Sequence, residues 1–124
     1  MCLMDLPHFE RQSELEGFLN IFSRIASKSW QERVWIGGGE VNECDSFDDT
    51  INDFFGVCDY IIKNYKIYKI NDIQLSLIIK FRNLLETFAS KYDLPVHFIH
   101  LSEWDNIVKI AQEILTSFSY PTSP

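Results

Sequence analysis

The stretch Asn71–Tyr92, NDIQLSLIIKFRNLLETFASKY, decides the fold. Its apolar residues recur every three or four positions, which is the spacing of one face of an α-helix. Asn71 or Asp72 is a suitable N-cap for this helix. A helix this apolar is expected at the centre of a bundle rather than at its surface. The face comprises Ile73, Leu77, Phe81, Leu84, Leu85, Phe88 and Tyr92, with Ile78 and Ile79 widening it.

The N-terminal part of the chain predicts two further helices. Ser13 fits an N-cap, and the helix that follows carries an apolar face from Leu15 to Ala26. A second, short helix is expected over residues 28–35, and the glycine triplet at 37–39 ends it in a flexible loop. No Gly-Lys-Ser/Thr sequence follows these glycines, so the pattern of a phosphate-binding loop is missing.

Two more helices open on capping boxes. In this motif a Ser side chain and an acidic side chain three residues later bind the backbone N–H groups of the first helical turn. Ser46 with Asp49 matches the motif, and so does Ser102 with Asp105 at the start of the last helix.

The remaining segments are less regular. Gly56 is expected to break its helix, and residues 57–70 are interpreted as mostly loop or distorted helix, with a short extended segment as the alternative. Residues 1–12 are expected to form an arm and residues 119–124 a frayed tail. The sequence therefore predicts an all-α fold, a single-domain bundle of four to five helices spanning residues 1–124.

Composition is consistent with one compact domain. The chain is 46% hydrophobic and contains ten Phe, which suffices for a core without disulfides or metal. There is no apolar run long enough for a membrane span, and the start lacks the features of a signal peptide. The three Cys are an odd number without Cys-x-x-Cys spacing. We therefore expect a cytoplasmic protein with reduced thiols.

The segment Glu40–Asp59 concentrates the negative charge of the chain. It contains seven acidic residues and no Lys or Arg, whereas the whole chain has 18 acidic and 11 basic residues and a net charge of -7. Such a patch attracts a basic partner and repels nucleic acid. The alternative is that each Asp merely favours loops and first helical turns. The candidate partner-binding residues are Glu40, Glu43, Asp45, Asp48, Asp49 and Asp53.

Trp35 is a further candidate for partner binding. It borders the glycine triplet, and Trp is enriched among the residues that dominate binding energy at interfaces. Its competing role is packing in the core. Lys63, Lys66 and Lys69 are expected to lie near the acidic segment and to pair with part of it.

Catalytic and metal-binding alternatives have weaker patterns. His97 and His100 could ligate zinc with nearby carboxylates, but the apolar residues between them favour burial. Cys58 continues an apolar helix face, where a buried, inert thiol is expected. A small hydrolase or transferase would need these three residues around an open cavity. We therefore expect no enzymatic activity, no metal and no cofactor.

Three stretches together resemble a known family. They are Trp30–Trp35 (WQERVW), Ser46–Ile51 (SFDDTI) and Trp104–Ala111 (WDNIVKIA), and their order covers most of residues 13–118. In these stretches the chain resembles small all-helical bacterial proteins found beside polymorphic toxins, including CdiI-type immunity proteins of contact-dependent growth inhibition.

This resemblance implies that the chain binds and neutralises a cognate toxin domain in the cytoplasm, as a monomer in a 1:1 heterodimer. Toxins of this class are frequently RNases, such as an EndoU-type CdiA C-terminal toxin. An RNase presents a cationic cleft to its substrate, which an acidic surface could cover in place of RNA. The alternative is a non-toxin adaptor or regulatory protein that binds a basic protein partner.

Overall fold

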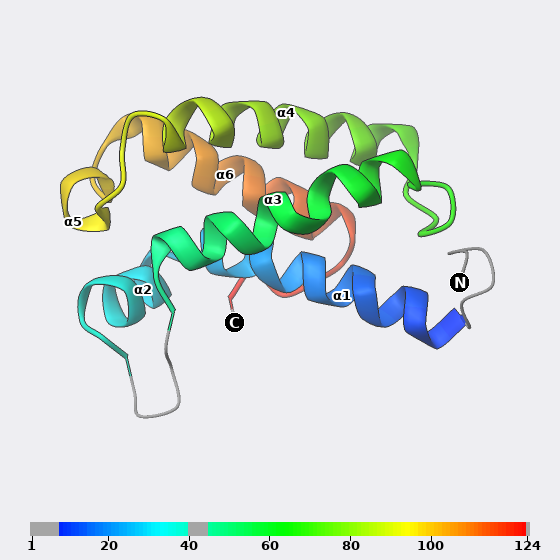
Figure 1. Ribbon diagram of the computed structural model, residues 1–124, viewed down its shortest axis with the longest axis horizontal. Helices are drawn as coiled ribbons and strands as arrows, with labels where there is room; N and C mark the ends of the chain where they lie inside the picture. Colours follow the sequence, from blue (N-terminus) through cyan, green and yellow to red (C-terminus); the bar gives the residue numbers. More distant parts are fainter. Residues whose placement is uncertain (1–7, 40–44, 124) are drawn as a thin grey trace.

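The computed structural model describes residues 8–39 and 45–123, and in these ranges the chain is all-helical (Figure 1). No strand occurs within them, so the predicted all-α fold class is confirmed. The elements are α1 (His8–Ile25), α2 (Lys28–Gln31), the π-helical turn η2 (Glu32–Ile36), α3 (Phe47–Lys63), α4 (Asp72–Ala89), α5 (Pro95–Phe98) and α6 (Ser102–Ser117).

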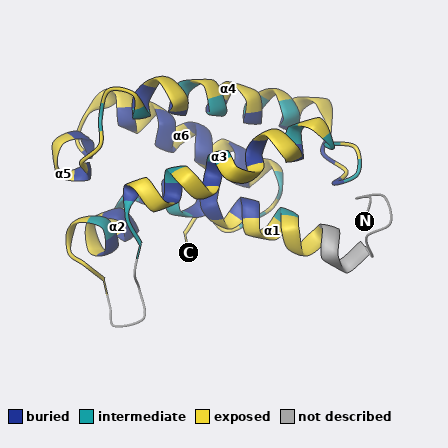
Figure 2. Cartoon of the chain, viewed as in Figure 1, coloured by how far each residue is buried: buried dark blue, intermediate teal, exposed yellow. Residues whose placement is uncertain are grey.

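The four long helices enclose one core. Helix α6 packs against α1 and α4, and α3 packs against the same two helices from the other side (Figure 1). The short elements η2 and α5 contact each other at one end of this bundle. Figure 2 shows that the buried residues of the long helices face inward. None of the helices in the described ranges has the length and apolar character needed to cross a lipid bilayer.

Aromatic rings fill the core in two groups. Phe18, Phe22, Phe54 and Phe81 join α1, α3 and α4, with ring centroids 4.9–5.7 Å apart. The second group lies where α5 meets η2 and contains the largest fully buried side chain, Trp104. Its other members are Trp30, Trp35, Phe47, Phe88, Tyr92 and Phe98. Edge-to-face and tilted contacts of this kind stabilise a core beyond the area that they bury.

The apolar stripe of α4 differs from the predicted face. Ile73 is 74% exposed and Ile79 is 38% exposed, so α4 keeps a face in solvent and is not the centre of the bundle. Seven of the 16 residues of α6 are buried, against five of the 18 in α4. Gln74 explains the shift: its side chain completes the capping box with Asn71 and donates to the Ser117 carbonyl, which turns this face inward. The buried residues of α4 are Gln74, Ile78, Phe81, Leu85 and Phe88.

Helix α1 begins earlier than predicted. It starts at His8, so residues 8–12 of the expected arm are helical and Ser13 lies inside the helix instead of capping it. Glu, Arg and Gln, which precede Ser13, have high helix propensity. Gln12 also donates to the Glu16 carboxylate one turn later, at 3.4 Å.

Helix α3 continues through Gly56, which was predicted to break it. The helix extends to Lys63, and only residues 64–69 form turns. Cys58 and Ile61 continue the buried stripe of Phe47 and Phe54, and this burial outweighs the intrinsic cost of one helical glycine.

The glycine triplet forms the C-terminal cap of η2 and is not the flexible loop that was predicted. The Gly37 N–H donates to the Glu32 carbonyl at 2.9 Å, which closes the wide π turn. A Cβ on Gly37 would lie 2.8 Å from the Arg33 carbonyl oxygen, and Gly38 and Gly39 have φ angles of 83° and 70°. Glycine is therefore required here by sterics and by the left-handed backbone.

Neither of the two predicted capping boxes forms in full. The N-cap of α6 is Leu101, which makes no side-chain cap, and Ser102 is the first helical residue. The Asp105 carboxylate instead accepts from Lys28, which ties α6 to α2. At the start of α3 half of the box forms: the Ser46 side chain accepts from the Asp49 N–H, but the Ser46 N–H donates to the Asp45 carboxylate and not to that of Asp49.

Candidate functional site

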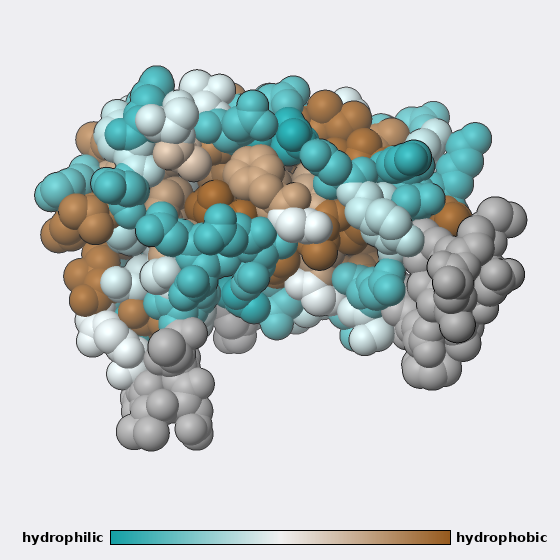
Figure 3. Space-filling model, in the orientation of Figure 1, coloured by the Kyte–Doolittle hydropathy of each residue, from teal (hydrophilic) through white to brown (hydrophobic). Residues whose placement is uncertain are grey.

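The acidic part of the chain that the structure describes begins at the N-terminus of α3. Ser46 caps the helix by accepting from the Asp49 N–H at 3.1 Å, and Phe47 is 3% exposed. These two contacts fix the first helical turn, so that Asp48 and Asp49 project into solvent. Hydrophilic surface covers the N-terminal half of α3 in Figure 3. Carboxylates are favourable here because a helix N-terminus carries partial positive charge.

Asp48 and Asp49 make no ion pair with any residue in the described part of the chain. Both are exposed. Their charge is therefore directed outward rather than compensated internally. Together with Asp53 they are called the acidic surface below.

Asp53 is only partly available. Its side chain is 58% exposed, and one carboxylate oxygen lies 3.5 Å from Arg24 Nη1. An exposed ion pair of this length contributes about 0–1 kcal/mol, so a partner can compete for the carboxylate at small cost.

Asp45 has a structural role. Its side chain is 14% exposed and lies 3.5 Å from Arg24 Nη1. It also accepts from the Thr50 hydroxyl at 2.8 Å and from the Ser46 N–H at 2.9 Å. These bonds hold Asp45, which precedes the N-cap residue Ser46, against the first turns of α3. Asp45 therefore stabilises the start of α3, and both of its carboxylate oxygens already have partners within the chain.

The lysines of residues 63–69 do not pair with these acids in the described ranges, contrary to expectation. The compensating cations are arginines: Arg24 for Asp45 and Asp53, and Arg82 for Asp59, at 2.7 Å. Both arginines come from helices that flank α3, which brings them beside its acidic side chains. Glu40 and Glu43 lie outside the described residues.

Trp35 packs into the second aromatic group. Its ring lies 5.7 Å from that of Trp30, 5.6 Å from that of Phe47 and 6.1 Å from that of Trp104. The indole N–H is buried and has no hydrogen-bond partner among the described residues. This placement favours the core-packing role over that of an interface anchor.

The residues weighed for catalysis lie in different surroundings. Cys58 is fully buried, and burial raises the pKa of its thiol to about 12. His97 lies in the short helix α5 and His100 follows it, and both are exposed. No group of three or more His, Cys, Asp or Glu side chains suited to a metal occurs in the described ranges.

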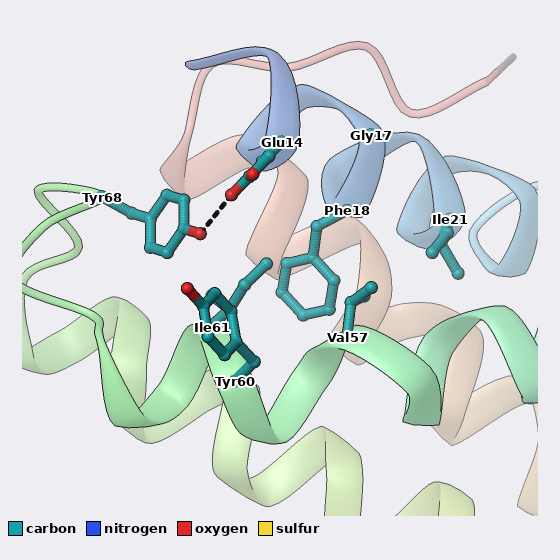
Figure 4. Close-up of a pocket in the computed structure, with 8 residues that line it drawn as sticks. All are labelled: Glu14, Gly17, Phe18, Ile21, Val57, Tyr60, Ile61 and Tyr68. Carbon is teal, nitrogen blue, oxygen red and sulfur yellow. Dashed lines mark hydrogen bonds between the residues drawn. The ribbon is translucent and has the colours of Figure 1, made fainter. Parts of the chain in front are cut away.

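A groove between α1 and α3 escaped the sequence analysis. Its volume is about 330 Å³, and it is lined by Glu14, Gly17, Phe18, Ile21, Val57, Tyr60, Ile61 and Tyr68 (Figure 4). Such a groove depends on how two helices pack, which local periodicity does not specify. The available signal was Gly17, an interior helical glycine that no cap or turn explains.

Comparisons with protein families, curated proteins and solved structures found no match to this chain.

Proposed function

We propose that the chain is an immunity protein of a polymorphic toxin system, which binds a toxic nuclease domain in the cytoplasm and covers its basic cleft. The observation that supports this proposal is the exposed charge of Asp48 and Asp49 at the capped start of α3, where neither carboxylate has an ion-pair partner among the described residues. The resemblance of the three stretches noted above to CdiI-type proteins supports the toxin as the class of partner.

Electrostatics fits the task of an immunity protein. Opposite charge can raise association rates to about 10⁸–10⁹ per molar per second at low salt. Fast capture matters because an immunity protein must bind its toxin before the toxin acts. Tight binding would come from a standard interface of roughly 1,600 Å² with a few buried anchors.

The nearest competing function is a non-toxin adaptor for a basic protein. The same acidic surface would serve it, because cationic protein surfaces are not restricted to nucleases. The two functions differ in what happens to the partner: an immunity protein abolishes an enzymatic activity, whereas an adaptor leaves it intact.

The experiment is co-purification with the protein encoded beside this chain, followed by an RNase assay of that partner. We expect a 1:1 complex and loss of RNase activity when the chain is added in equimolar amount. A complex whose partner has no nuclease activity would assign the chain to adaptors. The absence of any complex would contradict both functions.

A further inference from the structure

The groove between α1 and α3 exposes apolar surface that the fold does not use. Val57 is 39% exposed and Tyr60 is 49% exposed, and both project from α3 toward α1 (Figure 4). Phe18 and Ile61 form the buried floor. Hollows that are mostly apolar, with a few well-placed polar groups, are typical of binding sites in proteins.

One end of the groove carries a negative charge. The Glu14 carboxylate accepts a hydrogen bond from the Tyr68 hydroxyl at 2.5 Å, which joins α1 to the turns after α3 (Figure 4). Burial and the nearby Glu14 raise the pKa of Tyr68, so the phenol stays neutral and remains the donor. Among the described residues that line the groove, Glu14 alone is charged, so its carboxylate favours a positive charge on an occupant at this end.

The other end of the groove continues into the acidic surface. Asp49, Asp53, Val57 and Tyr60 follow each other on α3 at intervals of four, four and three residues, which places them on one stripe. The stripe from Asp49 to Tyr60 is about 16 Å long at a rise of about 1.5 Å per residue. An extended peptide covers that length with about five residues. Acidic Asp49 and Asp53 therefore precede apolar Val57 and Tyr60 on this stripe, and Glu14 of α1 lies at the far end of the groove.

Gly17 keeps the groove open. It lies inside α1, where glycine costs about 1 kcal/mol relative to alanine. Its φ is not positive, and a Cβ built on it would meet no atom within 4 Å. The fold therefore does not require glycine at this position, whereas a side chain would project into the groove that Gly17 lines.

We propose that this groove receives an apolar side chain of the protein partner, on a segment that carries basic residues on both sides of it. The inference rests on the proposed function, because it assumes that the same partner binds the acidic surface. Electrostatic attraction provides no buried apolar contact, and the groove supplies one. The basic residues of the partner would contact Asp49, Asp53 and Glu14, and its apolar side chain would pack on Phe18 in the groove.

The test uses a fluorescent peptide with Leu-Phe at its centre and lysines at both ends, and a control peptide with Ser-Ser at the centre. Gly17→Leu fills the groove. Ser76→Leu is the control, because Ser76 is an exposed residue of α4 and does not line the groove. Thermal melting of both variants checks their folding.

We expect the Leu-Phe peptide to bind wild type and Ser76→Leu alike, and to bind Gly17→Leu at least about tenfold more weakly, since a buried Leu or Phe contributes at least that factor. The Ser-Ser peptide should bind all three proteins equally weakly. The Val57 methyl signals in NMR spectra should shift only with the Leu-Phe peptide.

Two results would overturn the anchor. Equal binding of the Leu-Phe peptide to wild type and Gly17→Leu would show attraction by charge alone, and the proposed function would stand without the groove. No binding of the Leu-Phe peptide to wild type would remove the groove as a site. Neither result bears on whether the whole chain inhibits a nuclease, so the two proposals fail separately.

Discussion

At the scale of single residues, two glutamines complete the end of α1. The last carbonyls of a helix have no partner within the helix. Gln31 is fully buried, and its amide donates to the carbonyls of Arg24 and Ile25 at 2.9 and 2.8 Å. The Gln31 amide oxygen accepts from the Trp104 indole at 2.9 Å. Gln112, from α6, donates to the Ala26 carbonyl at 3.1 Å.

Replacing Gln31 by Leu should therefore destabilise the protein strongly. The variant keeps the volume but leaves two carbonyls and the Trp104 N–H buried without partners, for a loss of about 3 kcal/mol in the free energy of unfolding. Urea denaturation measures this loss. Gln112→Leu is the control and should lose at most about 1 kcal/mol, since Gln112 is exposed and water can replace it. Equal losses for the two variants would contradict the account.

The buried thiol of Cys58 gives a pH-dependent prediction. Burial, with a smaller effect of Asp59, raises its pKa from the ordinary 9.0 to about 12. The folded state thus holds the thiol proton more tightly than the unfolded state. The resulting contribution to stability is complete below pH 9 and is lost as the pH rises from about 9 to about 12.

Two measurements check the state of Cys58. Iodoacetamide should leave Cys58 unmodified in the native protein at pH 8 and alkylate it in urea, as read by peptide mass spectrometry. The free energy of unfolding should fall more between pH 7 and pH 10 in wild type than in Cys58→Ala. Rapid alkylation of the native protein would show that the thiol is accessible.

At the scale of elements, helix existence was largely predictable and helix boundaries were not. The five predicted helices are present because their apolar spacing reflects the core directly. Errors arose where a tertiary contact outweighed a local signal. Burial of the apolar stripe of α3 keeps the chain helical through Gly56, and Asp105 forms an ion pair with Lys28 instead of the predicted capping box. The helix α5 was missed because four residues are too few to show a period.

The same limit applies to the candidate site. Asp48 and Asp49 could be placed on a solvated helix start from the Ser46 cap alone. The burial of Asp45 could not, because its partner Arg24 lies 21 residues away in sequence. Trp35 could not be assigned between core and surface, because that depends on Trp104 from the far end of the chain.

Alanine substitutions at Gly56 and Gly37 should change the stability of the protein in opposite directions. Gly56→Ala should raise the free energy of unfolding by about 1 kcal/mol, since the Cβ meets no atom within 4 Å and alanine favours the helix. The melting temperature should rise by about 3–6 °C. Gly37→Ala should lower both the free energy of unfolding and the melting temperature, because the Cβ of the new alanine would lie 2.8 Å from the Arg33 carbonyl oxygen. Stabilisation by Gly37→Ala would contradict the helix end described above.

At the scale of the whole molecule, charge is distributed unevenly around a frame of packed helices. The ring of α1, α3, α4 and α6 holds the N-terminus of α3 in place. The chain carries a net charge of -7, and two of its acidic residues, Asp48 and Asp49, face solvent at that point without an ion pair in the described ranges. The proposed function requires that this charge attract a cationic nuclease before any close contact forms.

The most direct test is the association rate of the chain with its nuclease partner, measured by stopped-flow fluorescence for wild type and Asp48→Lys/Asp49→Lys. The control is Asp72→Lys/Glu113→Lys, which changes the net charge by the same amount. Asp72 lies in the first turn of α4, at the opposite end of the bundle from the N-terminus of α3 (Figure 1). We expect the Asp48/Asp49 variant to associate at least about tenfold more slowly at low salt, to lose protection against the nuclease and to stay folded. The control should associate nearly as fast as wild type. Full protection and an unchanged rate in the Asp48/Asp49 variant would contradict the assignment of this surface.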